Sequence, residues 1–209
     1  MDEQVLVSTR RALHAVAESL LAGPQYRAEG TIRLQVTPGG FGQVAGPLRV
    51  EGTPAGVQLV GAGAGVPLRG TLDDLAAAVG VEAGAPDLYH DHADLDAEAE
   101  LAVDPAAAAL LLDWFARADA AMRRFAPDQT PVLWPEHFDL GIALDEVNYG
   151  ASPGDAGHPA PYAYVGPWTS REGAFWNAPF GALRPADRLP DATANAAFFA
   201  EGRAAAASG

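Results

Sequence analysis

A long apolar stripe dominates the middle of the sequence. Asp104-Pro105 places a capping carboxylate before a proline at the first helical position, which is a strong signal for the start of a helix. The apolar residues that follow share one side of that helix: Leu111, Trp114, Phe115, Ala118, Met122 and Phe125. Such a stripe is typical of a buried core helix, so the sequence predicts a long central helix.

Three shorter helices are also expected. Apolar residues at helical spacing run through residues 5–21, and Gly23-Pro24 closes that segment. A second helix begins at Thr71, with a capping hydroxyl and acidic residues in its first turn, and ends at Gly80. A third lies near residues 193–201, and the tail after about Gly202 is expected to fray.

Alternation of apolar and polar residues predicts the strands. They are expected at residues 31–36, 48–51, 57–60, 138–148 and 162–165. A loop rich in Gly, Pro and Ala, residues 150–160, joins the last two. An antiparallel sheet built from these hairpins, packed against the long central helix and the N-terminal and C-terminal helices, defines an α+β fold. We expect a single α+β domain over residues 1–209.

Composition excludes several classes of function. All 13 basic residues are arginine, so lysine chemistry is absent, and there is no cysteine to form a disulfide or a thiolate metal site. The formal net charge of -14 makes nucleic acid and anionic membranes poor partners. The N-terminus shows no signal-peptide pattern, and no apolar run is long enough to span a bilayer. A cytoplasmic protein is therefore expected.

Aromatic and titratable residues gather between positions 134 and 176. Alternation along the strand after Pro135 would place the side chains of His137 and Asp139 on one face, beside the small residues Gly141 and Ala143. A few polar groups beside small residues and aromatic walls are typical of a ligand pocket. The predicted pocket residues are Trp134, Glu136, His137, Asp139, Tyr162, Tyr164, Trp168 and Trp176.

The same strand has a purely structural interpretation. If Tyr149 pairs with Pro161 across the loop, Asp139 lies opposite Arg171. The two side chains would then form a cross-strand ion pair that contributes about 0.2–1 kcal/mol and implies no function. Both interpretations depend on the register of the hairpin.

A second candidate site is a His-x-His pair in an acidic segment. In an extended chain the imidazoles of His90 and His92 point the same way, and carboxylates flank them. A divalent transition metal needs three or four such ligands, and a further one could come from His137, His158, Glu136 or Asp139. The alternative is a solvated acidic loop. Otherwise no cofactor is indicated.

Several short motifs follow one another between residues 113 and 168. They are Ala118-Asp119, Arg124-Phe125, Thr130-Pro131-Val132, Phe138-Asp139-Leu140 and Tyr162-Ala163-Tyr164. In these motifs the chain resembles an uncharacterised bacterial domain family of the actinobacterial type, a domain of unknown function. The resemblance covers about a quarter of the chain, which departs from it by carrying Pro135-Glu136-His137 before the strand. It implies an α+β domain of a cytoplasmic bacterial protein and supplies no catalytic residues.

Three functions remain open. The leading hypothesis is a protein that binds a small molecule in the aromatic-walled pocket near His137 and Asp139. The second is a metal-dependent hydrolase or lyase that uses the segment of His90 and His92, with Glu136 or Asp139 as general base. The third is a scaffold or homodimeric interaction protein that pairs through an open sheet edge.

Overall fold

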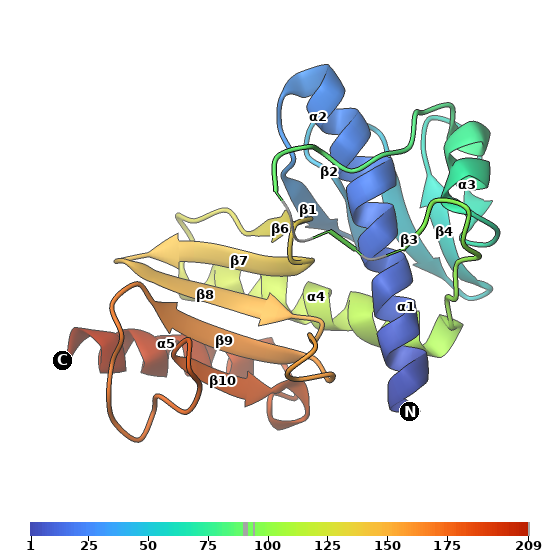
Figure 1. Cartoon of the computed structure of the whole chain (residues 1–209). Coiled ribbons are helices and arrows are strands. Elements are labelled where there is room, and N and C mark those ends of the chain that lie inside the picture. Colours follow the sequence, from blue (N-terminus) through green and yellow to red (C-terminus); the bar gives the residue numbers. More distant parts are fainter. Residues whose placement is uncertain (90–91, 94, 209) are drawn as a thin grey trace. The chain divides into compact units, whose positions relative to one another are not determined.

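The computed structural model describes residues 1–89, 92–93 and 95–208 (Figure 1). Its helices and antiparallel strands confirm the predicted α+β fold. The chain divides into two compact units. Unit 1 contains Met1–Asp113 and Leu133–Phe138, and unit 2 contains Trp114–Val132 and Asp139–Gly209. The single domain over residues 1–209 stays a prediction.

The long helix predicted from the apolar stripe is α4, Pro105–Phe125, and it contributes residues to both units. The carboxylate of Asp104 accepts hydrogen bonds from the backbone N–H groups of Ala106 and Ala107 at 3.0 and 2.9 Å. The cap and the first-turn proline therefore fix the start of the helix where the sequence predicts it. Members of the stripe are fully buried: Leu111, Trp114, Phe115, Ala118 and Met122.

Six strands of unit 1 pair in the order β6-β1-β2-β3-β4-β5. They are β1 (Leu34–Thr37), β2 (Gly40–Gln43), β3 (Arg49–Thr53), β4 (Gly56–Val60), β5 (Val66–Pro67) and β6 (Val132–Trp134). Neighbouring strands β1 to β5 are joined by turns, whereas β6 arrives from much later in the chain and pairs Leu133 with Leu34. The strands predicted at residues 48–51 and 57–60 are confirmed as the hairpin of β3 and β4, with Thr53 paired to Gly56 at its turn.

The helices of unit 1 are α1 (Glu3–Val16), the π-helix η1 (Ala17–Ala22), α2 (Gly23–Glu29) and α3 (Leu72–Val79). The prediction that the first helix closes at Gly23-Pro24 is wrong. Helical backbone continues to Glu29 and stops at Gly30, whose φ of 71° is favourable for glycine. Pro24 lies in the first turn of α2, and the Ser19 carbonyl oxygen five residues before it accepts the backbone N–H of Gly84 at 3.1 Å.

Four strands of unit 2 pair in the order β10-β9-β8-β7. They are β7 (Asp139–Leu144), β8 (Val147–Ser152), β9 (Tyr162–Pro167) and β10 (Ala182–Pro185). The predicted single strand over residues 138–148 is wrong, because Asp145 and Glu146 have φ values of 54° and 59° and turn the chain. Tyr149 consequently pairs with Val165 instead of Pro161, so the predicted pairing of Asp139 with Arg171 is also wrong.

Helix α5 (Ala192–Ala207) covers one face of these strands, after the short 3₁₀ helix η2 (Ala186–Arg188) (Figure 1). The ring of Tyr149 packs against the rings of Phe125 and Phe199, with centroids 4.8 and 6.0 Å away. α5 continues past Gly202, where the sequence predicts fraying, because Ala206 is buried. Aromatic packing between α4, β8 and α5 thus forms the core of unit 2.

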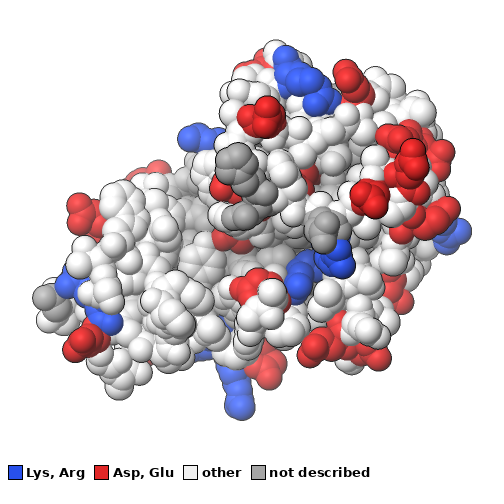
Figure 2. All heavy atoms as spheres, in the orientation of Figure 1, with Lys and Arg blue, Asp and Glu red and all other residues white. Residues whose placement is uncertain are grey.

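The surface reflects the uneven distribution of charge along the sequence. No basic residue occurs between Arg69 and Arg117. Figure 2 shows acidic side chains gathered over α3, whose first turn carries Asp73 and Asp74. Within the described part of the chain, no helix is both long enough and apolar enough to cross a membrane.

Candidate functional site

The face predicted to form a pocket is filled by a tyrosine ring. Tyr164 of β9 lies over Gly150 of β8, where an added Cβ would meet the Tyr164 Cζ atom at 2.1 Å. The Tyr164 hydroxyl donates a hydrogen bond to the carboxylate of Asp139, which is buried. Burial, and after it the charge of Asp139, raises the pKa of Tyr164 well above its usual value. The small residues on this face therefore make room for a neighbouring side chain.

Tyr162 lies two residues earlier on the same face, and its hydroxyl also binds a carboxylate. Its hydroxyl donates a hydrogen bond to the carboxylate of Asp155, which also accepts the backbone N–H groups of Gly157 and His158 at 2.7 and 2.8 Å. Burial, and after it the hydrogen bond to Asp155, raises the pKa of Tyr162 above its usual value. Tyr162 and Asp155 thus hold the loop between β8 and β9, and the hydrogen bonds of both Tyr162 and Tyr164 stabilise the fold.

Three of the predicted pocket residues belong to unit 1. Trp134 lies in β6, and the guanidinium of Arg33 lies over its ring, 5.7 Å from the centroid. Glu136 and His137 lie in the turn after β6, with 3.7 Å between the His137 Nε2 and a Glu136 oxygen. The imidazole of His137 is exposed, so the prediction that it shares a strand face with Asp139 is wrong.

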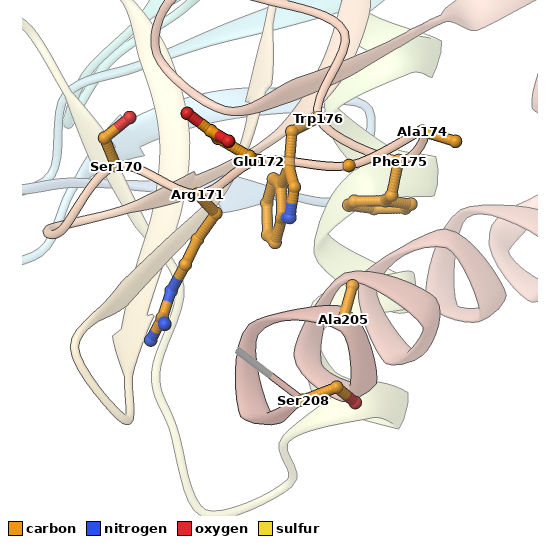
Figure 3. Close-up of a pocket in the computed structure, with 9 residues that line it drawn as sticks. Ser170, Arg171, Glu172, Ala174, Phe175, Trp176, Ala205 and Ser208 are labelled. Carbon is orange, nitrogen blue, oxygen red and sulfur yellow. The ribbon is translucent and has the colours of Figure 1, made fainter.

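The other two tryptophans among the predicted pocket residues, Trp168 and Trp176, lie in unit 2 in different environments. The side chain of Trp168 is exposed, and its indole N–H donates to the Asn148 side chain at 3.2 Å. Trp176 lines a hollow of about 460 Å³ formed by the loop of residues 170–176 together with Ala205 and Ser208 of the C-terminal end of the chain. In Figure 3 the rings of Phe175 and Trp176 face α5. We call this space the Trp176 hollow.

A second hollow, of about 300 Å³, lies in the same unit. The β7–β8 turn, Tyr149, the chain after β9 and the last turns of α5 form its walls. We call it the Tyr149 hollow. Arg171 lines both hollows, and the two together are named the Arg171 site.

Two residues that line the Tyr149 hollow have buried polar atoms without a hydrogen-bond partner. Among the described residues, neither the Tyr149 hydroxyl nor the Arg171 Nε forms a hydrogen bond, although both atoms are buried. Burial raises the pKa of Tyr149 to about 12, while the charge of Arg203 lowers it and the charge of Asp145 raises it. The phenol therefore keeps its proton at neutral pH, and its hydroxyl is buried without a partner among the described residues.

Arg203, on the wall of the same hollow, is already paired. Its Nε and Nη2 atoms donate to one carboxylate oxygen of Asp145 at 3.0 and 2.6 Å. No ion pair joins Arg171 to any residue in the described part of the chain. Arg171 thus lines both hollows without an ion-pair partner, while Glu146 and Glu172 also belong to their linings.

Unit 1 has its own buried polar cluster, centred on Glu18 in the π-helix η1. Its carboxylate accepts the backbone N–H of Ala93 at 2.6 Å and lies 3.2 Å from Nδ1 of His92. The Nε2 atom of His14 is 3.8 Å away and is 2.6 Å from the Pro135 carbonyl oxygen. Burial lowers the pKa of His14 below 6.5. π-helical turns are rare and occur frequently at functional sites, so this cluster is the second candidate site.

The predicted metal ligands are only partly described. His90 lies outside the described residues, and His92 is half exposed with its Nδ1 directed at Glu18. In the ranges that the structure describes, no group of three or more His, Asp or Glu side chains could hold a metal ion. Metal binding by His90 and His92 stays a prediction.

Sequence reasoning missed Tyr149, Arg203 and Glu18 as site residues and assigned Arg171 only to an ion pair. Glu18 had a detectable signal, because it interrupts the apolar run that includes Leu20. Arg171 and Arg203 had no such signal in the sequence, because one lies in a loop and the other in helix α5, and only the fold brings them to the same hollow. Comparison of the chain with protein-family models, with curated proteins and with solved structures finds no match.

Proposed function

We propose that the protein binds a small organic molecule at the Arg171 site. The observation that carries the proposal is that Arg171 lines both hollows and that its Nε has no partner among the described residues. A buried donor left without a partner costs about 1–3 kcal/mol, and folded proteins seldom leave one in that state. A ligand that accepts hydrogen bonds from the Arg171 guanidinium would offset part of that cost.

The shape and lining of the site support the same proposal. The hollows of about 300 and 460 Å³ lie within the range of small-molecule sites. Aromatic side chains (Tyr149, Phe175 and Trp176) provide apolar walls, and Arg171 supplies a charged group between them. A few polar groups converging in an apolar lining are typical of ligand pockets. Trp176, one of the predicted pocket residues, would then be a contact residue.

A fluorescence and thermal-shift screen tests this function. The full chain is titrated with phenylacetate, phenylacetamide, phenethylamine and phenyl phosphate, chosen to share one ring and differ in polar group. We expect at least one of them to raise the melting temperature and to change tryptophan emission. The emission change should disappear in Trp176→Phe and persist in Trp134→Phe, the matched control in unit 1.

Two results would contradict the proposal. One is that none of the four compounds shifts the melting temperature or the emission. The other is a response of equal size in Trp176→Phe and wild type, because the compound would then bind elsewhere.

The His92–Glu18 pair favours a second candidate function, the metal-dependent hydrolase or lyase. Metal-binding histidines commonly direct one ring nitrogen at a buried carboxylate and leave the other for the metal. His92 has this arrangement, with Nδ1 at 3.2 Å from a carboxylate that is 2% exposed. Elemental analysis of chelator-free protein should then find a divalent transition metal that His92→Ala loses, with a melting temperature lowered by EDTA. Metal-free protein with an unchanged melt would exclude this function.

A further inference from the structure

We infer that the ligand of the Arg171 site is an uncharged molecule that carries a carboxamide group beside an aromatic ring. This inference rests on the proposed function and adds the chemical class of the ligand. It depends on the signs of the charges that line the two hollows, on the hydrogen bonds that those charged groups can make and on the aromatic wall of the Trp176 hollow.

Charges of both signs line each hollow. Arg171 belongs to both linings, together with Glu172 in the Trp176 hollow and with Glu146 in the Tyr149 hollow. A carboxylate bound at Arg171 would therefore share the hollow with a glutamate, and an ammonium group bound at a glutamate would share it with Arg171. Like charges brought close together repel, so a singly charged ligand of either sign is penalised and an uncharged one is not.

The arginine and the two glutamates have no ion-pair partner of their own. In the described part of the chain, the ion pair on the wall of the Tyr149 hollow joins Arg203 to Asp145 and includes neither Arg171 nor Glu146. Figure 3 shows the Glu172 carboxylate directed away from the Arg171 guanidinium. The guanidinium and the carboxylates therefore remain available for hydrogen bonds to a ligand.

A carboxamide matches this combination of groups. A guanidinium can only donate hydrogen bonds, and a carboxylate can only accept them. The carbonyl oxygen of an amide can accept from Arg171, while its N–H can donate to Glu146 or Glu172. Both hydrogen bonds then involve a charged partner, which makes them stronger than bonds between neutral groups. The ligand gains them without taking a charge of its own out of water.

The Trp176 hollow supplies the surface for the ring of the ligand. The rings of Phe175 and Trp176 meet edge to face, with centroids 4.9 Å apart and planes at 90°. Ala205 of α5 lies opposite them across the hollow (Figure 3). A flat apolar ring can pack against these side chains while its carboxamide lies beside Arg171, which borders both hollows.

Isothermal titration of the full chain with phenylacetamide, phenylacetate and phenethylamine compares a neutral, a negative and a positive ligand built on the same ring. Glu146 and Glu172 are exposed to solvent, which weakens their effect. Phenylacetamide should therefore bind about 2- to 5-fold more tightly than either charged compound. A salt concentration of about 0.5 M should reduce this difference, because salt screens the repulsion between like charges.

Removing the charges of one sign should reverse the preference. The double variant Glu146→Gln, Glu172→Gln leaves Arg171 unopposed, so phenylacetate should then bind more tightly than phenylacetamide. Arg171→Gln leaves the glutamates unopposed, so phenethylamine should then bind most tightly of the three. Asp187→Asn and Arg188→Gln are the controls, because both residues are exposed and lie in the same unit, and they should leave the order unchanged.

The outcomes distinguish this inference from the function on which it rests. If phenylacetate, phenethylamine or phenyl phosphate binds the wild-type chain as tightly as phenylacetamide, or more tightly, the uncharged ligand is wrong and the small-molecule function stands. An order of affinities that stays the same in Arg171→Gln and in the double glutamate variant would also overturn the inference, because these charges would then not select the ligand. Failure of all four compounds to bind would contradict the proposed function itself.

Discussion

Replacing Glu18 by glutamine tests the buried cluster of unit 1. The carboxylate is buried and accepts the Ala93 N–H at 2.6 Å, with His92 Nδ1 at 3.2 Å. Glutamine keeps the volume and one acceptor oxygen but removes the charge that strengthens both contacts. It leaves His92 and Ala93 less firmly attached to η1.

The size of the effect follows from these two contacts. A hydrogen bond to a charged group contributes about 1.5–3 kcal/mol and a neutral one about 0.5–1.5 kcal/mol. The His92 side chain is 40% exposed, so solvent screening reduces its share. We expect Glu18→Gln to lower the free energy of unfolding by about 1–2 kcal/mol. For a chain of this size that corresponds to a melting temperature lower by about 2–8 °C.

Thermal melts followed by circular dichroism measure the global effect, and hydrogen exchange of the Ala93 amide measures the local one. Glu29→Gln is the control, since Glu29 is an exposed glutamate at the end of α2. The Ala93 amide should exchange faster in Glu18→Gln than in the control. If both variants melt at the same temperature and protect Ala93 equally, the carboxylate does not hold this segment and the reasoning is wrong.

Two further predictions concern packing and pH. Gly150→Ala forces the Tyr164 ring aside and should lower the free energy of unfolding in urea by about 1–3 kcal/mol. Gly63→Ala is the control, because a methyl group there meets open space. Equal stabilities of the two variants would contradict this prediction. Burial lowers the pKa of His14, so below pH 6.5 its unfolded form binds a proton that the folded form does not, and stability falls with decreasing pH. His14→Gln should flatten that dependence of the unfolding free energy, and an unchanged slope would refute the assignment.

Elements set by local chemistry could be predicted from the sequence. Helix α4 begins where Asp104 and the following proline predict, because the Asp104 carboxylate accepts backbone N–H groups of the first turn. The same holds for α3, where Thr71 and Asp74 cap each other's backbone groups and Gly80 adopts a φ of 74° at the end. In these segments the side chains that decide the structure are within one helical turn of the backbone that they bind.

The β7–β8 hairpin could not be predicted in this way. Its turn consists of Asp145 and Glu146, both with positive φ, where Gly or Asn is the usual signal. Conversely, Gly150 looked like part of a loop but lies in β8, since the Tyr164 ring requires the space above it. This need for a glycine comes from packing between two strands, so the sequence around Gly150 does not reveal it.

The candidate site was only partly accessible from the sequence for a similar reason. Alternation identified Asp139 beside small residues, but a shelf of small residues accommodates a ligand and a neighbouring ring equally well. The structure fills it with Tyr164. Of the predicted residues, Trp176 lines a hollow, and two of its neighbours there, Ala205 and Ser208, come from the C-terminal end of the chain, which no short-range pattern connects to it.

The division of the chain has a consequence for its synthesis. Unit 1 is completed by Leu133–Phe138, after the segment Trp114–Val132 of unit 2 has already been made. A chain emerging from the ribosome therefore has β1 without its neighbour β6, and the unpaired edge of β1 remains open to other nascent chains in the meantime. No single cleavage would release either unit whole. A fragment library of this gene should accordingly yield few well-behaved truncations, even though each unit is compact.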